Sequence, residues 1–326
     1  MNAKIVATGS YLPKKILTNF DLEKMVDTSD EWITQRTGIH IRHIAEEGEY
    51  TSDLAAKAAF DILDNAGISA SEIDLLVLAT ATPDMPFPAT ALFVQEKIDA
   101  RNAFAFDINA ACSGFMYALS IATAHIKAGM VKNALVIGAE TLSRITDWTD
   151  RSTCVIFGDG AAGVLLEATD DEDKGVLSLV LHSDGRYTDL MNMPAPGSRK
   201  PCSVEAIENR DIYIKMKGNE TFKMAVRSIV NVSKEALDLV GLSFSDVDWM
   251  VAHQANRRII EGVTKRVDLD TDKAIITIDR HANTAAASIP LALDWAVKNG
   301  KIKEGDLILL NSFGASLTWS AGVIRW

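Results

Sequence analysis

Two octamers of this sequence, GISASEID at 67–74 and GLSFSDVD at 241–248, carry four identical residues at matching positions. Each follows a stretch whose apolar residues recur at helical spacing, and each runs into a strand-like segment, LLVLAT or WMVAHQ. A second similar pair lies downstream, AACSGFMYALSIATAHIKAG at 110–129 and ANTAAASIPLALDWAVKNG at 282–300. Both members are apolar helix candidates that end in glycine. Repeats of this kind indicate a chain built from two similar halves.

Strands alternate with helices in each half, which is typical of a layered α/β fold. The helices that we expect after Cys112 and Asn283 are almost entirely apolar, so we expect them to be buried between two sheets. The sequence therefore predicts a duplicated α/β sandwich with an N-terminal half at 1–170 and a C-terminal half at 171–326. Near the junction, the charge run DDEDK and the stretch MPAPGSRKP predict a surface loop.

Composition excludes several classes of protein. The net charge of −11 disfavours non-specific binding to nucleic acid. No apolar run approaches the roughly 20 residues of a membrane span, and no signal peptide is visible. The three cysteines, Cys112, Cys154 and Cys202, form no CxxC pair, so we expect neither a disulfide framework nor a zinc site. We therefore expect a cytoplasmic protein that binds no metal and does not insert into membranes.

Cys112, His253 and Asn283 form a candidate catalytic set. Cys112 and Asn283 occupy matching places in the downstream repeat, and His253 follows a strand where the first half has Ala79. Packing of the halves about a pseudo-twofold axis would bring the three together. A helix N-terminus favours a thiolate, and imidazole and carboxamide groups can donate hydrogen bonds to a thioester oxygen. Each residue alone is more often structural, so the prediction depends on all three.

Six strings that span the whole chain resemble the β-ketoacyl-acyl carrier protein synthase III family, the condensing enzymes that start bacterial type II fatty acid synthesis. They are DEWITQRTGI (30–39), FDINAACSGF (106–115), ETLSRITDWTDRSTCVIFGDGAAG (140–163), HQANRRII (253–260), NTAAASIP (283–290) and FGASLTW (313–319). The resemblance implies a thiolase-like αβαβα sandwich of five layers, working as a homodimer.

The resemblance also implies a reaction. The thiol of Cys112 takes an acyl group from acyl-CoA, malonyl-acyl carrier protein loses carbon dioxide, and the resulting carbanion attacks the acyl-enzyme. His253 and Asn283 would stabilise the enolate, and the backbone N–H groups of Cys112 and Ala315 would hold the oxyanion. Acyl-CoA is then a substrate, and no cofactor is implied. The chain departs from the family at Ala315 and Ser316, where a glycine-rich turn is usual, and in a longer loop at 192–204.

Binding residues for CoA come from the same resemblance, which places Trp32, Arg36 and Arg151 around the adenine and the phosphates. Along the pantetheine channel it places Asn219, Phe222, Ala255 and Asn256, with Thr28 as a weaker member. From the residues themselves, Trp32 and Arg36 share one face of a short helix. Thr28 and Glu31 predict a capping box at the start of that helix, and Gly38 predicts its end.

Partner surfaces are predicted at two further places. After His253, a predicted helix carries a basic stripe of Arg258, Lys265 and Arg266, which Arg257 extends. This stripe would dock the acidic acyl carrier protein, although such a run is often only a solvated face. Phe87 matches a family phenylalanine that crosses the dimer to form the floor of the partner's acyl pocket. It would favour short primers such as acetyl, and the alternative is an ordinary buried aromatic residue.

Three other functions remain in view. A papain-like peptidase has its residues in the same order, Cys, His and Asn, but the CGSCW-type signature is missing and the halves are duplicated. A non-catalytic module could bind CoA or the carrier protein on the same fold. A related condensing enzyme with a different acyl donor, for secondary metabolites or signals, is the alternative that the sequence separates least well.

Overall fold

The computed structural model describes residues 1–314 and 317–326, and of residues 219–221 and 223 it describes the backbone alone. Two predicted site residues are affected by these bounds. Ala315, named with Ser316 in the oxyanion turn, lies outside the described residues, and so does the side chain of Asn219.

Two mixed sheets with the same strand order form the frame of the molecule. In the first sheet the order is β1 (Asn2–Tyr11), β7 (Gly160–Thr169), β6 (Asn133–Glu140), β4 (Leu75–Ala79) and β5 (Phe104–Ile108). In the second it is β8 (Gly175–Ser183), β13 (Thr318–Arg325), β12 (Leu307–Gly314) and β11 (Trp249–Ala252). The pairings of β4 with β6 and of β11 with β12 are parallel, and the remaining pairs that match between the sheets are antiparallel. The two sheets therefore repeat one topology.

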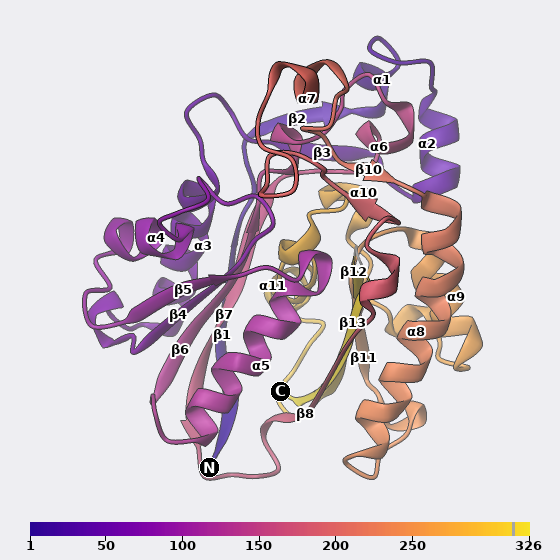
Figure 1. Cartoon of the computed structure of the whole chain (residues 1–326). Helices are drawn as coiled ribbons and strands as arrows, with labels where there is room; N and C mark the ends of the chain where they lie inside the picture. The colour runs from indigo at the N-terminus through magenta and orange to yellow at the C-terminus, as the bar shows by residue number, and fades with distance from the viewer. Residues whose placement is uncertain (315–316) are drawn as a thin grey trace.

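Three helical layers enclose these sheets (Figure 1). The central layer holds α5 (Gly114–Lys127) and α11 (Ser288–Lys298), and the outer layers hold α3 (Thr51–Ala66) with α4 (Thr90–Ile98), and α8 (Gly218–Asp238) with α9 (Arg257–Arg266). Alternate residues of β4 serve different layers, because Leu76 packs with α3 and α4 whereas Val77 packs with α5 and α11. Strands buried on both faces are apolar throughout. The arrangement is the predicted five-layer αβαβα sandwich.

The shorter elements gather over one end of the sandwich, at the top of Figure 1. They are β2 (Lys15–Thr18), α1 (Asn19–Leu22), α2 (Asp30–Thr37), β3 (Ile41–Ile44), α6 (Arg151–Cys154), β9 (Met191–Asn192), α7 (Val204–Glu208), β10 (Lys215–Met216) and α10 (Ile278–His281). Among the residues that the structure describes, none of the helices has the length and hydrophobicity that a membrane span requires. The boundary between the halves at 170 stays a prediction.

The repeated octamers fold alike. Gly67 and Gly241 adopt φ angles of 69° and 68°, a left-handed conformation that glycine enters without steric cost. Ser69 and Ser243 each cap a single 3-10 turn, and the acidic residue three positions later bonds back to the serine N–H at 2.9 and 2.8 Å. Each turn then leads directly into the parallel strand of its sheet, β4 or β11.

Matching 3-10 turns also precede the two central helices, and they correct the predicted pairing of the halves. Cys112 is the middle residue of the turn Ala111–Ser113, and Ala286 is the middle residue of the turn Ala285–Ala287. The first residue of each turn has a positive φ, 48° and 42° respectively. Cys112 is therefore equivalent to Ala286, and its predicted equivalence to Asn283 is wrong.

Asn283 instead corresponds to Asn109. The Oδ1 atoms of Asn283 and Asn109 accept hydrogen bonds from the N–H two residues later, at 2.9 and 3.1 Å. The predicted pairing failed because α5 has 14 residues and α11 has 11. Aligning the glycines at their C-terminal ends displaced the N-terminal ends.

Candidate active site

Cys112 lies two residues before α5 and belongs to a small apolar cluster. Its side chain is buried with those of Leu142, Phe157, Ile214 and Ala285. The positive end of the α5 dipole lies within two residues of Cys112, and this favours a thiolate over a thiol. The surroundings are therefore suited to a nucleophile that receives an apolar acyl group.

Asn283 lies beside the same cluster. Its N–H donates to the carbonyl of Ile156 and its carbonyl accepts from the N–H of Gly158, both at 3.0 Å. Phe157, which packs with Cys112, stands between these two residues and forms an isolated β-bridge with Asn283. Because Oδ1 accepts from the Ala285 N–H, the carboxamide is oriented with its NH₂ group turned away from that contact, as a hydrogen-bond donor.

His253 follows β11 and is fixed by the backbone and by one side chain. Its N–H donates to the Asn311 carbonyl on β12 at 2.8 Å, and its own carbonyl accepts from the Ala255 N–H at 3.0 Å. Nδ1 lies 2.5 Å from Ser288 Oγ. Burial lowers the pKa of His253 to about 3, so the imidazole is neutral at physiological pH. Nε2 is buried and has no partner within the described residues.

The β12–β13 hairpin connects these residues. Ser312 Oγ, next to Asn311, donates to Ser113 Oγ at 2.9 Å, and Thr318 Oγ1 donates to the Ala110 carbonyl at 3.1 Å. Gly314 approaches the Cys112 backbone so closely that a Cβ at 314 would lie 3.2 Å from the Cys112 nitrogen. The described ends of β12 and β13, Gly314 and Thr318, therefore lie beside the Cys112 amide, where an oxyanion site would need its donors.

The three predicted catalytic residues thus come from distant parts of the sequence to adjacent backbone segments. A buried thiol at a helix N-terminus, a neutral imidazole and an oriented carboxamide are the groups needed for acyl transfer and for enolate stabilisation. Within the described part of the chain, no cluster of three or more His, Cys, Asp or Glu side chains is placed to hold a metal ion.

The predicted capping box of α2 is wrong. The cap is Ser29, whose Oγ accepts from the Trp32 N–H at 3.1 Å, and Thr28 lies one residue before the cap. Either of these consecutive hydroxyl residues could cap from its type alone, and the helix begins one residue later than predicted because Ser29 takes the extended cap conformation. Gly38 ends the helix with a φ of 81°, as predicted.

Two guanidinium groups lie close to the indole ring of Trp32. Arg36 Cζ is 5.8 Å and Arg151 Cζ is 5.1 Å from the centroid of the Trp32 ring. Arg151 is further held by a 2.7 Å hydrogen bond from its guanidinium to the carbonyl of Asp27. The structure therefore brings together the predicted adenine and phosphate residues from α2 and α6.

A chain of contacts extends from this tryptophan toward α8. Asn256 Nδ2 donates to the Arg36 carbonyl at 2.9 Å, and Asn256 Oδ1 caps α9 by accepting from the Arg258 N–H at 2.9 Å. The Arg258 guanidinium lies 5.6 Å from the ring centroid of Phe222 on α8. Arg258, predicted only as a docking residue, thus adjoins the predicted pantetheine residues.

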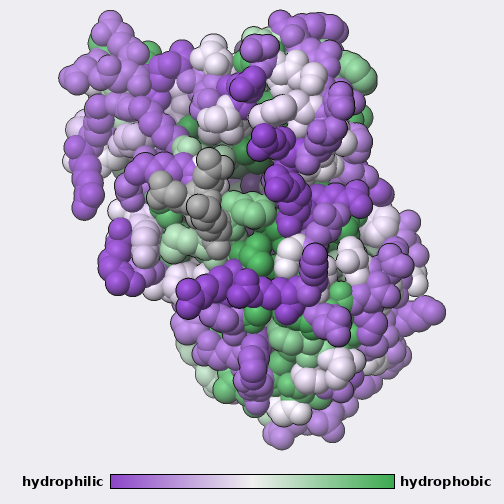
Figure 2. All heavy atoms as spheres, turned by 90° about the vertical axis from the view of Figure 1, so that its right-hand side faces the viewer, coloured by the Kyte–Doolittle hydropathy of each residue, from purple (hydrophilic) through white to green (hydrophobic). Residues whose placement is uncertain are grey.

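The four basic residues of α9 are exposed, on a face of the molecule that hydrophilic side chains largely cover (Figure 2). They are Arg257, Arg258, Lys265 and Arg266. Arg257 pairs with Glu261 at 2.8 Å, and its side chain covers Gly38. Phe87 is 83% exposed, so the alternative of an ordinary buried aromatic residue is wrong.

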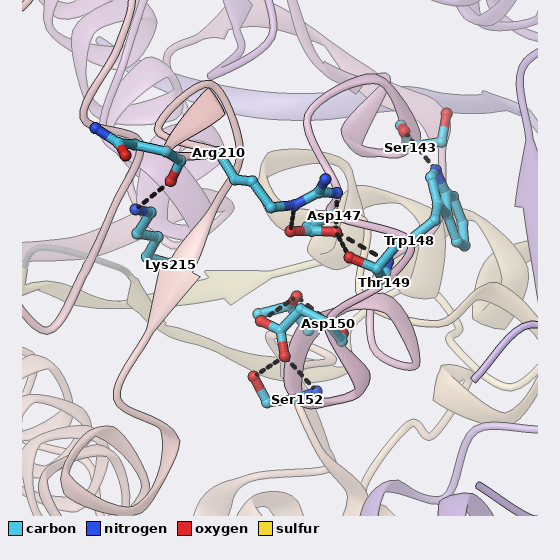
Figure 3. Close-up of polar contacts among 10 residues, drawn as sticks. Ser143, Asp147, Trp148, Thr149, Asp150, Ser152, Arg210 and Lys215 are labelled. Atoms are coloured by element: carbon cyan, nitrogen blue, oxygen red, sulfur yellow. Dashed lines mark hydrogen bonds and ion pairs between the residues drawn. The ribbon is translucent and has the colours of Figure 1, made fainter. Parts of the chain in front are cut away.

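One support of the site escaped the sequence prediction. The guanidinium of Arg210 makes two hydrogen bonds to the Asp147 carboxylate (Figure 3) and holds the pKa of that carboxyl well below its usual range. Nearby, the Ile214 N–H donates to the Ile145 carbonyl at 2.9 Å. These bonds fix the segment that places Ile214 against Cys112.

Glu140, at the end of β6, is a second unpredicted feature. Its carboxyl group is fully buried, accepts hydrogen bonds from Thr82 Oγ1 at 2.5 Å and from the N–H of Ala81 at 3.1 Å, and faces the Ala286 amide. Burial raises the pKa of Glu140 to about 7. Because β6 and β12 match residue by residue, Glu140 is equivalent to Gly314, just as Ala286 is equivalent to Cys112. The N-terminal half therefore places a carboxyl group, that of Glu140, beside the Ala286 amide. At the equivalent position beside the Cys112 amide, the C-terminal half has Gly314.

Comparison with known proteins gives a consistent result. The profile of 3-Oxoacyl-[acyl-carrier-protein (ACP)] synthase III matches residues 106–185, and that of its C-terminal part matches residues 237–326. The chain is 51% identical to Beta-ketoacyl-[acyl-carrier-protein] synthase III of Rhodospirillum centenum and 52% identical to that of Paramagnetospirillum magneticum. Each match covers 100% of this chain and 99% of the relative.

Solved structures agree with the sequence comparison. The crystal structure of 3-oxoacyl-[acyl-carrier-protein] synthase III from Aquifex aeolicus VF5 superposes with a TM-score of 0.92 at 47% identity, covering 99% of this chain and 100% of the other. The priming beta-ketosynthase of the R1128 polyketide pathway superposes with a TM-score of 0.91, at 31% identity, over 99% and 96% of the two chains. These similarities confirm the predicted thiolase-like fold.

Proposed function

The chain belongs to the 3-oxoacyl-[acyl-carrier-protein] synthase III family and is a β-ketoacyl synthase of fatty acid biosynthesis, and from this premise we propose how it condenses acyl-CoA with malonyl-acyl carrier protein. The Cys112 thiol attacks the acyl-CoA carbonyl, the bond from that carbonyl carbon to the CoA sulfur breaks, and CoA leaves as a thiol. Malonyl-acyl carrier protein then releases carbon dioxide, and its α-carbon attacks the Cys112 thioester. Cys112 leaves as a thiolate and regains a proton, which completes the balance of the cycle.

Negative charge develops on oxygen in three steps of this cycle: on the acyl oxygen during transfer to Cys112 and again during the condensation, and on the malonyl thioester oxygen during decarboxylation. Two different sets of groups stabilise it. In acyl transfer and in the condensation, the backbone N–H groups of Cys112 and Ala315 stabilise the tetrahedral oxyanion. In decarboxylation, His253 Nε2 and Asn283 Nδ2 donate to the enolate oxygen. Both side-chain donors are neutral and buried, so their hydrogen bonds act in a low dielectric.

The observation that carries the proposal is that Cys112 and Asn283 both contact Phe157. A single strand, β12, bonds to His253 through Asn311 and approaches the Cys112 amide at Gly314. Incubation with a panel of acyl-CoAs, followed by intact mass measurement, tests the proposal. We expect an acyl adduct that is absent in Cys112→Ala. Cys154→Ala is the matched control and should still be acylated, because burial raises the pKa of that thiol to about 11. An adduct that persists in Cys112→Ala would contradict the assignment.

The roles of His253 and Asn283 need a second assay, which measures the two half-reactions separately. We expect His253→Ala to accept the acyl group and to fail in decarboxylating malonyl-acyl carrier protein. Unchanged decarboxylation would remove His253 from the mechanism. The same acyl-CoA panel addresses the alternative of a different acyl donor, because the donor that loads fastest identifies the primer.

CoA binding falls to the residues around Trp32 in this proposal. The indole stacks on the adenine, and Arg36 and Arg151 neutralise the phosphates. Asn219, Phe222, Ala255, Asn256 and, less strongly, Thr28 line the path of the pantetheine. The contacts that support this are the two guanidinium groups over the indole and the Asn256 bond to Arg36.

A homodimer is also part of the proposal. Phe104 lies on β5, the last strand of its sheet, and is 46% exposed, and Leu92 and Phe87 nearby in the sequence are 42% and 83% exposed. An apolar sheet edge of this kind favours pairing with another chain. Phe87 would then enter the acyl pocket of the partner and select short primers such as acetyl. Sedimentation equilibrium should give a dimer, and Phe87→Ala should load longer acyl groups than the wild type.

The exposed basic residues of α9 would dock the acidic carrier protein through charge complementarity. They form a basic stripe on a chain whose net charge is −11, so this face would attract an acidic partner that the rest of the surface repels. They are Arg257, Arg258, Lys265 and Arg266. A cytoplasmic location also belongs to the proposal, because the exposed thiol of Cys202 persists in a reducing compartment.

A further inference from the structure

Ser288 holds the catalytic imidazole through a hydroxyl whose direction the structure determines. It is the first residue of α11 and is 1% exposed. Its Oγ lies 3.2 Å from the Gln254 nitrogen and 2.5 Å from His253 Nδ1. A backbone N–H can only donate, so Oγ accepts from Gln254. Within the described residues, His253 Nδ1 is the one acceptor in range for the hydroxyl hydrogen.

The protonation of His253 follows from that direction. If Ser288 donates to Nδ1, then Nδ1 must be the unprotonated ring nitrogen. A neutral imidazole carries one hydrogen, which is therefore on Nε2. Since burial keeps the ring neutral, Nε2 is a donor and has no lone pair with which to accept a proton.

We propose that Ser288 is a positioning residue that fixes His253 as the Nε2–H tautomer, so that the imidazole donates a hydrogen bond to the enolate and does not act as a base. This inference rests on the proposed function, because it concerns the donor that meets the malonyl thioester. It assigns Cys112 ionisation to the helix dipole and not to His253. Loss of Ser288 should therefore affect decarboxylation and spare acyl loading.

Nitrogen NMR of the full-length protein labelled with ¹⁵N-histidine tests the tautomer directly. The chain contains six histidines, and the His253 signals are identified by their absence in His253→Asn. We expect a neutral Nε2–H ring from about pH 5 to 8, with Ser288→Thr unchanged and Ser288→Ala shifted toward the Nδ1–H form. An Nδ1–H or doubly protonated ring in the wild type would overturn the proposal.

Kinetics of the two half-reactions supply the functional readout. In Ser288→Ala we expect decarboxylation to fall by about tenfold or more, up to the ~10²–10³-fold loss expected for removing a donor outright. Acyl loading should stay within about twofold, and Ser288→Thr should restore decarboxylation. Equal loss of both steps with an unchanged tautomer would make Ser288 merely structural. Failure of Cys112 to load acyl groups would refute the proposed function instead. The tautomer of His253 would still be decided by the NMR measurement alone.

Discussion

Glu140→Gln should make the protein less sensitive to pH, because the Glu140 carboxyl is buried at the end of β6. Burial raises its pKa from 4.5 to about 7. The folded protein thus binds this proton more tightly than the unfolded chain, so the associated stability is complete below pH 4.5 and is lost as the pH rises toward 7 and beyond. A pKa difference of this size corresponds to about 3 kcal/mol in the free energy of unfolding. Glutamine cannot ionise and does not incur this loss.

Urea unfolding at a series of pH values from about 4.5 to 8 measures the effect. The protein concentration must be constant, because a dimer gains stability with concentration. We expect the stability of Glu140→Gln relative to the wild type to rise by about 3 kcal/mol across this range. The exposed Glu172→Gln serves as control and should show a flat difference. If the difference in unfolding free energy between Glu140→Gln and the wild type is also independent of pH, the reasoning is refuted. This holds even if the substitution lowers stability by the same amount at every pH.

Four further substitutions give distinct outcomes. Gly314→Ala would place a Cβ 3.2 Å from the Cys112 nitrogen, so the acyl-loading rate should fall by about 10²–10³-fold, whereas Gly185→Ala, in open space, should load normally. Trp32→Ala should raise KM for acyl-CoA by about tenfold, the loss of one aromatic stacking contact, with kcat nearly unchanged. Asp147→Asn removes the charge that Arg210 binds, so thermal stability should drop and become less sensitive to salt, as a melting series in sodium chloride would show. Lys265→Glu, on the α9 stripe but away from the Arg258–Phe222 contact, should weaken use of malonyl-acyl carrier protein while loading from a short acyl-CoA stays near normal, and an equal loss of both would place the docking surface elsewhere.

The fold was predictable because the two halves carry the same local sequence signals at equivalent positions. Ser69 and Ser243 begin equivalent turns with the same side-chain chemistry, and each precedes an apolar strand. The pairing of Cys112 with Asn283 failed because helix length was free to change between the copies. A glycine marks where a helix ends, but it carries no information about where the helix starts. The asparagine two residues before each turn, Asn109 and Asn283, was the better guide.

Contacts between distant residues account for what the sequence left out. Ser288 reads as an ordinary small residue at a helix start, and its bond to His253 exists only after β11 and α11 have packed. The ion pair of Arg210 with Asp147 joins two loops in the same way. By contrast, Trp32 and Arg36 were predictable as neighbours because they are four residues apart on one helix.

The matching places of Glu140 and Gly314 bear on how a reactive half and an inert half arise from one ancestor. In the half without the nucleophile, the Glu140 carboxyl lies beside the Ala286 amide, and it is negatively charged only in the molecules that have lost its proton, since its pKa is about 7. The glycine at 314 leaves the matching place beside the Cys112 amide open, so the transient negative charge on a thioester oxygen can occupy it. A carboxylate restored at 314 would therefore act as a tethered inhibitor of its own enzyme.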